Sequence, residues 1–152
     1  PLAIKKLLKT EEIDAVVTLA EGREEPPRSG RIRFERPSCE LRLRADPGQL
    51  RQVLLNLVLN GLQAGDGGGV VSLGCRREGG QAIISVRDSG PGFSAEALAN
   101  AFTPFFTTRR EGTGLGLAVS HRIVEQHGGA IRLGNHPDGG GLVEVALPLD
   151  EA

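Results

Sequence analysis

The chain of 152 residues contains no methionine, tryptophan or tyrosine, and it has only two cysteines and three histidines. Cys39 and Cys75 lie far apart in the sequence and form no C-x-x-C pair. This pattern favours buried thiols in a reducing compartment, with a single disulfide as the alternative. None of the histidines has metal-ligand spacing with an acidic residue or a cysteine, so the sequence indicates no histidine-based metal site.

Long apolar runs and an excess of charge of one sign are also absent. No run approaches the ~20 apolar residues that span a bilayer, and nothing resembles a signal peptide. With a net charge of -1 and no basic half, the chain offers no surface typical of nucleic-acid binding. We therefore expect a cytoplasmic domain, either of a cytoplasmic protein or as the cytoplasmic portion of a membrane-bound one, with no nucleic-acid partner and no direct membrane contact.

The chain begins at Pro1 and lacks methionine throughout, so we expect it to be a fragment of a longer protein. Its length is sufficient for a hydrophobic core, and we expect residues 1–152 to form a single domain.

Alternation of apolar and polar residues predicts strands that come largely in adjacent pairs. These segments are 31–36 with 40–45, 70–77 with 81–88, and 130–135 with 142–149, while 2–8 fits a strand or a short helix. Helical periodicity and capping residues predict helices at about 10–20, 47–64, 94–101 and 115–127. The pattern indicates an α+β fold, a two-layer α/β sandwich with a mixed, mainly antiparallel sheet packed on helices, rather than a doubly wound parallel sheet.

The helix predicted at 47–64 carries a narrow stripe of neutral amides on an otherwise apolar surface. At about 100° per residue, the stripe contains Gln52, Asn56, Asn60 and Gln63, with Gln49 beside them. A solvent-facing side of a helix is normally broader and carries lysine or glutamate. The amides either touch water or line a polar cavity, in which an asparagine oxygen is a suitable ligand for Mg²⁺.

The segment RDSGPGF, residues 87–93, follows a predicted strand and places Asp88 next to Gly90 and Gly92. Such a segment is typical of a turn. A carboxylate at a strand end, beside glycines that let a flat ring approach, can also accept a hydrogen bond from an exocyclic amine such as that of adenine. A buried aspartate without a partner of this kind is costly.

The segment FTPFFTTRREGTGLGL, residues 102–117, combines aromatic residues, Arg109 and Arg110, and three alternating glycines. One interpretation is a glycine-rich hinge with a hydrophobic plug. The other is a loop that closes over phosphates and offers them guanidinium groups and the N–H groups of a helix start. A P-loop is excluded because this segment has no lysine, and the glycine spacing differs from the Rossmann fingerprint.

Taken in order, these segments resemble the catalytic ATP-binding domain of sensor histidine kinases, in the superfamily that includes gyrase B, Hsp90 and MutL. QVLLNLVLNGLQA resembles the N box, DSGPGF the G1 box, FTPFF the F box and GTGLGL the G2 box. The resemblance covers about residues 40–150. It implies a Bergerat-type α/β sandwich that binds ATP and Mg²⁺ under a mobile lid, at about residues 102–114.

The resemblance also implies a role for each matching residue. Asn60 would hold Mg²⁺, Asn56 would assist at the phosphates or the metal, and Asp88 would bind the adenine amino group. Arg109 and Arg110 would act in catalysis together with these asparagines. The other expected nucleotide contacts are Gly90, Gly92, Phe93, Thr107, Thr108, Gly112, Thr113, Gly114, Leu115, Gly116 and Leu117.

Three positions separate this chain from relatives or from other branches of the superfamily. Asn56 stands where ATPases of the gyrase and Hsp90 type carry a glutamate general base, which favours phosphotransfer over ATP hydrolysis. Gln63 replaces a lysine found in many relatives, and Gly61 replaces the usual alanine. Our hypothesis is that Arg109 or Arg110 supplies the missing positive charge.

No histidine of the chain is followed by an acidic residue, as the phosphoacceptor histidine of the family typically is. The resemblance therefore implies an acceptor in a dimerisation hairpin that the sequence lacks, with residues 1–9 continuing from it, and relay to a response-regulator receiver domain. We expect the fragment to be a monomer and the full-length protein a homodimer. The alternatives are a superfamily ATPase or anti-sigma type of serine kinase, and a non-catalytic nucleotide-binding interaction module.

Overall fold

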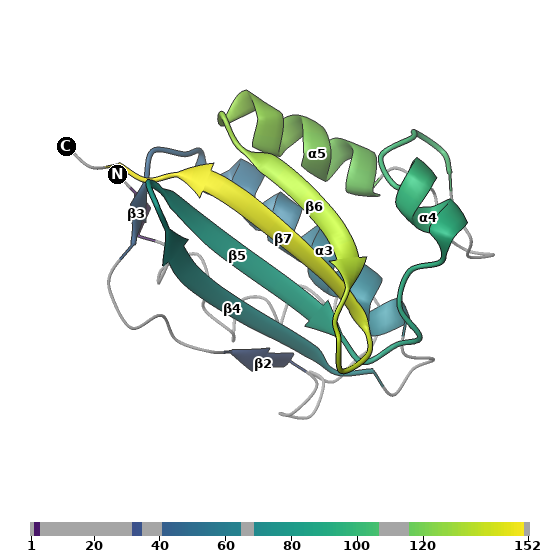
Figure 1. Cartoon of the computed structure of the whole chain (residues 1–152). Coiled ribbons are helices and arrows are strands. Elements are labelled where there is room, and N and C mark those ends of the chain that lie inside the picture. Colours follow the sequence, from purple (N-terminus) through teal and green to yellow (C-terminus); the bar gives the residue numbers. More distant parts are fainter. Residues whose placement is uncertain (1, 4–31, 35–40, 65–68, 107–115, 151–152) are drawn as a thin grey trace, which may run out of the picture.

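The computed structural model describes residues 2–3, 32–34, 41–64, 69–106 and 116–150. The helix predicted at 10–20, Cys39 and residues 107–114 of the expected lid lie outside the described residues, as does Leu115. The described part of the chain forms two layers, a five-stranded sheet with helices packed against one face (Figure 1). This arrangement confirms the predicted α+β sandwich.

The sheet has the strand order β2-β4-β5-β7-β6, and only the β2–β4 pair is parallel. Its strands are β2 (Ile32–Phe34), β4 (Val71–Glu78), β5 (Gln81–Asp88), β6 (Ala130–Asn135) and β7 (Gly141–Pro148). The predicted hairpins β4–β5 and β6–β7 are confirmed, and β5 pairs with β7 to join them. Asp88 therefore ends a strand in the middle of the sheet.

The predicted pairing of the segments 31–36 and 40–45 is wrong. Each contains a short strand, but β2 joins the main sheet, whereas β3 (Arg42–Leu43) pairs with β1 (Leu2–Ala3) in a separate two-stranded sheet. Leu43 also forms an isolated bridge with Leu149. Strands this short carry too little side-chain pattern to determine their partners, so contacts distant in the sequence decide the pairing.

Two of the helices, α3 (Pro47–Ala64) and α5 (Gly116–Gln126), cover the same face of the sheet, and α4 (Ala95–Asn100) lies near one end of it (Figure 1). Asp46 caps α3, since its Oδ1 accepts a hydrogen bond from Gln49 N at 3.0 Å, and Ser94 caps α4 in the same way through Ala97 N at 3.1 Å. Helix α5 ends before Gly128, whose φ of 75° is the left-handed conformation that glycine adopts readily. These boundaries confirm the three predicted helices in the described residues.

The core lies between the helices and the sheet. Alternate strand residues that face the helices are buried, namely Val71, Leu73, Ala82, Ile84, Val86, Val143, Val145 and Leu147. They meet buried residues of α3, among them Leu50, Val53, Leu54, Leu57, Val58 and Leu62. Each large side chain of this kind contributes roughly 1.5–3 kcal/mol by leaving water. This packing holds the end of β5 against the last turns of α3.

Candidate functional site

The amide stripe of α3 is divided between solvent and the interior. Asn56 and Asn60 are half-buried, and the exposed members of the stripe are Gln49, Gln52 and Gln63. The side-chain nitrogen of Asn56 donates hydrogen bonds to Gly116 O and Ser120 Oγ, both 3.3 Å away. Because Ser120 is completely buried, these bonds tie the middle of α3 to the first turns of α5. The glutamines touch water, as one interpretation of the stripe predicts, and only the asparagines turn toward the interior.

Gly116 and Leu117 are the expected G2-box contacts that the structure describes. A Cβ built on Gly116 would lie 3.9 Å from Cβ and Cγ of Asn56, so the start of α5 runs close to α3. Leu117 packs against the core. The remaining expected contacts lie outside the described residues: Thr107, Thr108, Arg109, Arg110, Gly112, Thr113, Gly114 and Leu115. The fold thus brings the N box to the end of the G2 box, 60 residues further along the chain.

Asp88, the last residue of β5, is held by two backbone N–H groups. Its Oδ1 accepts hydrogen bonds from Gly90 N at 2.9 Å and from Gly141 N at 3.0 Å. Hydrogen bonds to an ionised carboxylate are stronger than neutral ones, and two of them fix the orientation of the group. Both of these bonds are to Oδ1, and Oδ2 has no hydrogen-bond donor among the described residues.

The loop after β5 uses glycine where its backbone approaches neighbouring elements. A Cβ on Gly90 would lie 2.7 Å from the backbone oxygen of Ala64, at the end of α3. Gly92 has a φ of 88°, and a Cβ there would lie 2.7 Å from Oδ1 of Asn135. Both glycines are therefore required by close packing, and their role in shaping a purine pocket stays a prediction.

The presence of Gly61 instead of alanine has a local cause. A Cβ at this position would lie 2.8 Å from Cγ2 of Val71 and 3.3 Å from Cβ of Asp88. Val71 is fully buried, so it has little room to move away. Helix α3 thus approaches β4 and β5 closely at this turn, which brings Asn60, the preceding residue, into the neighbourhood of Asp88.

Sequence reasoning missed the contribution of the β6–β7 hairpin to this region. Asn135, the last residue of β6, accepts a hydrogen bond from Phe93 N at 2.7 Å and donates one to Phe93 O at 3.0 Å. The backbone of Gly140 packs against the backbone oxygen of Asp88 so closely that a Cβ would overlap it. The available signal was the glycine run at 139–141, which by itself predicts only a turn.

The phenylalanines before and at the start of the expected lid divide into packed and exposed residues. Phe93 and Phe102 pack against the core. Phe102 also stacks on His121 of α5, with ring centroids 4.5 Å apart and an interplanar angle of 20°. Phe105 is 74% exposed and has a φ of 66°. Aromatic anchoring therefore applies to Phe102 and not to Phe105.

Residues 45–151 match the family described as histidine kinase-, DNA gyrase B-, and HSP90-like ATPase. The chain is 47% identical to sensor histidine kinase ZraS of Escherichia coli (strain K12) over 119 residues, which are 78% of this chain and 26% of ZraS. It is 37% identical to sporulation kinase C of Bacillus subtilis (strain 168) over 107 residues, 70% of this chain and 25% of that protein. The chain spans about a quarter of the length of these curated relatives.

Solved structures agree with the sequence matches. The nucleotide-free catalytic domain of histidine kinase ThkA superposes with a TM-score of 0.72 at 33% identity, covering 91% of both chains. Full-length ShkA in complex with AMPPNP gives a TM-score of 0.78 at 30% identity, covering 100% of this chain and 31% of ShkA.

The chain therefore belongs to the histidine kinase-, DNA gyrase B-, and HSP90-like ATPase family. Within that family it is the catalytic ATP-binding domain of a sensor histidine kinase. In the part of the chain that the structure describes, no helix has the length and apolarity needed to cross a bilayer.

Proposed function

We propose that this domain binds ATP with Mg²⁺ and donates the γ-phosphoryl group to a histidine in a dimerisation hairpin outside this sequence. The phosphoryl group then passes to an aspartate of a response-regulator receiver domain. The observation that carries the proposal is the Asp88 carboxylate, with Oδ1 bonded to two backbone N–H groups and Oδ2 left for a ligand. A carboxylate oxygen only accepts hydrogen bonds, so it favours a purine with an amino group at C6, such as adenine, over one with an oxygen there, such as guanine.

The residues present fit a magnesium ion. The described residues contain no group of three or more His, Cys, Asp and Glu side chains that could enclose a metal. Nucleotide-bound Mg²⁺ needs no such cage, because one or two protein oxygens, phosphate oxygens and waters complete its octahedron. In this proposal the protein oxygen is the side-chain oxygen of Asn60, half-buried one turn beyond Asn56 on α3. Bound there, Mg²⁺ would neutralise charge on the phosphates.

Phosphoryl transfer breaks the bond between the γ-phosphorus and the bridging oxygen of the β-phosphate, while a bond to an imidazole nitrogen of the acceptor forms and ADP leaves. The contribution of this chain to the reaction is to bind ATP and to position its γ-phosphoryl group for transfer. In this proposal Asp88 orients the base, and the backbone N–H groups at the start of α5, which begins at Gly116, would bind the phosphates. Arg109 and Arg110 stabilise the charge on the transferred group from the lid. The other proposed lid contacts are Thr107, Thr108, Gly112, Thr113, Gly114 and Leu115.

Asn56 supports a kinase over an ATPase or an anti-sigma type of serine kinase. An amide cannot take a proton from water at neutral pH, so Asn56 cannot serve as a general base. Its side-chain nitrogen is also engaged with Gly116 O and Ser120 Oγ. Positioning at the junction of α3 and α5 is therefore its function in this proposal.

Calorimetric titration of ADP with Mg²⁺ into the wild type and into Asp88→Asn tests the base site, with GDP as the control ligand. Asparagine can still accept the Gly90 and Gly141 hydrogen bonds through its oxygen, but its nitrogen cannot accept from adenine. We expect wild-type binding of ADP over GDP and a loss of about 10- to 100-fold in the variant. A wild type that binds neither nucleotide contradicts the proposal.

Transfer from γ-labelled ATP to the separately supplied dimerisation hairpin of the full-length protein tests the chemistry. Acid-labile label on the hairpin histidine supports the kinase. Binding of ATP without any transfer would instead identify a non-catalytic nucleotide-binding module.

We infer that the domain works in the cytoplasm, where ATP is available, and that the full-length protein is a homodimer joined through the hairpin. The 152-residue chain alone should then be a monomer, and light scattering should give the 16.1 kDa of a single chain.

A further inference from the structure

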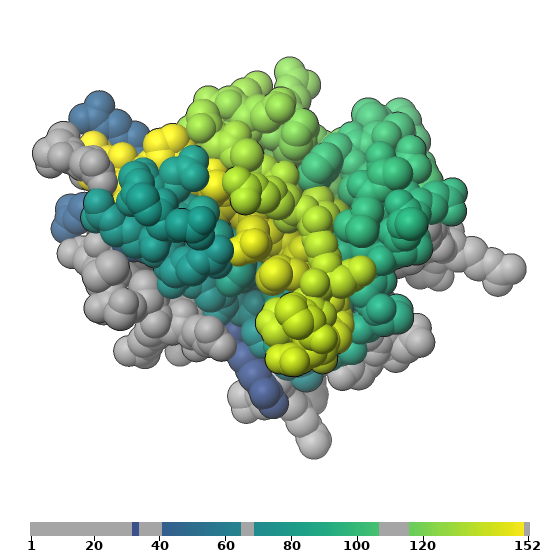
Figure 2. Space-filling model, viewed as in Figure 1, coloured from purple at the N-terminus to yellow at the C-terminus, as the bar shows by residue number. Residues whose placement is uncertain are grey.

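The turn between β6 and β7 contacts Asp88 and the loop after it from several directions. Asn135 bonds to Phe93, Gly140 packs against the Asp88 backbone oxygen, and Gly141 N donates to Asp88 Oδ1. In Figure 2 the turn forms a rounded projection beside the segment that contains α4. The loop that carries the G1 box is therefore held by a hairpin more than 40 residues away in the sequence.

Asn135 acts on this loop as an adjacent strand would. Its side-chain amide pairs with both the N–H and the C=O of Phe93, at 2.7 Å and 3.0 Å, although Phe93 lies outside the sheet. The left-handed Gly92 brings the backbone directly over the amide oxygen. Asn135 is itself exposed, so the burial of its side chain does not explain its position. Its contacts instead fix where the loop between Asp88 and Phe93 lies.

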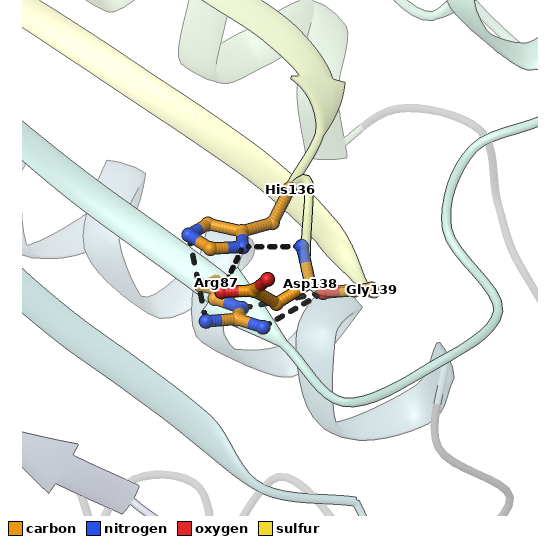
Figure 3. A network of polar contacts seen from close by, with 4 residues as sticks. All are labelled: Arg87, His136, Asp138 and Gly139. Carbon is orange, nitrogen blue, oxygen red and sulfur yellow. Dashed lines mark hydrogen bonds and ion pairs between the residues drawn. The ribbon is translucent and has the colours of Figure 1, made fainter.

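A second set of contacts holds the turn from the other face of the sheet (Figure 3). Arg87 Nε and Nη2 donate to Gly139 O at 3.3 Å and 3.0 Å, and Arg87 Nη1 lies 3.5 Å from His136 Nε2. Within the turn, Asp138 N donates to His136 Nδ1 at 3.1 Å. Arg87 and Asp88 are consecutive on β5 and point to opposite faces, so the turn is held from both sides of the strand.

We propose that the β6–β7 turn is a positioning element for the base pocket and that Asn135 is a specificity-determining residue within it. By fixing the loop Asp88–Phe93, Asn135 keeps Asp88 Oδ2 where it meets the 6-amino group of a purine nucleotide. The ligand class it favours is therefore adenine nucleotides over 6-oxo purine nucleotides. This inference rests on the proposed function, in which Asp88 binds the base.

Displacement of a fluorescent ADP analogue by ADP and by IDP tests the inference on the 152-residue chain with Mg²⁺ present. The two ligands have the same ribose and diphosphate and differ at purine C6, so their affinity ratio reports on the contact with Asp88. We expect Asn135→Ala to weaken ADP about five- to tenfold and to change IDP less than about twofold. Asn135→Asp keeps the acceptor for Phe93 N and loses the donor, so it should give an intermediate ratio.

A matched control is Asn100→Ala, because Asn100 also donates to a backbone oxygen, that of Glu96 at 3.0 Å, within α4. Its ADP/IDP ratio should equal that of the wild type. Arg87→Ala removes the contacts that hold the turn from the opposite face of the sheet. It should also lower the preference for ADP over IDP, by a smaller factor than Asn135→Ala does.

Different results overturn different statements. If Asn135→Ala weakens the binding of ADP and of IDP by the same factor, or changes neither affinity, the positioning role of Asn135 is wrong while the base site stands. If the wild type has no preference for ADP over IDP, or if Asp88→Asn keeps that preference, the proposed base site is wrong and the inference is overturned with it.

Discussion

Asn56 donates its side-chain N–H groups to Gly116 O and to Ser120 Oγ at 3.3 Å, which joins two helices that are far apart in the sequence. Asn56→Ala would remove both bonds and leave the hydroxyl of a completely buried serine without this partner. We expect the free energy of unfolding to fall by about 1–2 kcal/mol, measured by urea denaturation. Gln52→Ala, an exposed amide one turn earlier, should change it by less than about 0.5 kcal/mol. Equal effects of the two substitutions would contradict the structural role of Asn56.

Asn60→Ala tests the proposed metal ligand. In the wild type, Mg²⁺ should strengthen ATP binding relative to EDTA, because in the proposed site Asn60 would hold the ion that accompanies the nucleotide. In the variant we expect this difference to shrink by about tenfold, with the affinity in EDTA unchanged. The control is Gln63→Ala, which alters an exposed amide of the same stripe and should retain the full magnesium effect. A variant with undiminished dependence on Mg²⁺ would show that the ion is held elsewhere.

Gly61→Ala should destabilise the domain although alanine is the better helix former. Alanine gains about 1 kcal/mol in helix propensity, but its Cβ would lie 2.8 Å from Cγ2 of the buried Val71. Overpacking typically costs about 1–3 kcal/mol. We therefore expect the free energy of unfolding, measured by thermal denaturation, to fall by about 1 kcal/mol.

The double variant Gly61→Ala/Val71→Ala removes the close methyl group and should show a favourable coupling in a double-mutant cycle. Gly134→Ala, where a Cβ meets nothing within 4 Å, is the open-space control and should cause no loss. A stabilised Gly61→Ala protein would mean that α3 moves away from β4 at little cost.

The stack of Phe102 on His121 should couple the two residues energetically. Stacked aromatic pairs contribute about 0.5–1.5 kcal/mol beyond their buried area. Phe102→Ala, His121→Ala and the double variant, compared by chemical denaturation, should give a coupling energy in that range. Phe105→Ala removes a ring that is 74% exposed and should have an effect below about 0.5 kcal/mol. Strict additivity of the two single substitutions would exclude the stack as a stabilising contact.

Arg76 lies between two carboxylates on the sheet surface, 2.8 Å from Glu144 and 3.0 Å from Glu78. The hydrogen bond to Glu144 is the main reason that the pKa of Arg76 is raised above its ordinary value. The stabilisation is therefore fully present below that ordinary pKa and is lost only as the pH rises through the raised pKa. Because the arginine side chain is half exposed, we expect Glu144→Gln to cost less than about 1 kcal/mol.

The loss of stability caused by Glu144→Gln should disappear at about 1 M salt, since screening removes most of the attraction between exposed charges. Denaturation at low and high salt near neutral pH measures it. A loss that persists at high salt would indicate that Glu144 acts through packing instead of charge.

Much of the architecture was predictable from local patterns, because α3 and the two long hairpins carry clear periods and recognisable caps. Asp88 could be selected from its place at a strand end beside glycines, and its proximity to α3 follows from the fold. The double hydrogen bond from Asn135 to Phe93 could not be predicted, because it depends on how a hairpin 42 residues further along the chain packs on the loop. The prediction that β2 pairs with β3 was wrong because contacts distant in the sequence decide the pairing when strands of two or three residues do not define a register.

The small ladder of β1 and β3 lies at the opposite end of the sheet from Asp88. Leu43 joins Leu2 on one side and Leu149 on the other, and Pro148 pairs with Gln81, the first residue of β5 (Figure 1). Asp88 closes the same strand, about 23 Å away at the usual rise per residue. The ladder thus joins Leu2, Leu43 and Leu149 at the end of the sheet that lies far from Asp88. A substitution confined to this ladder therefore acts at the end of β5 remote from Asp88, with the whole length of the strand between them.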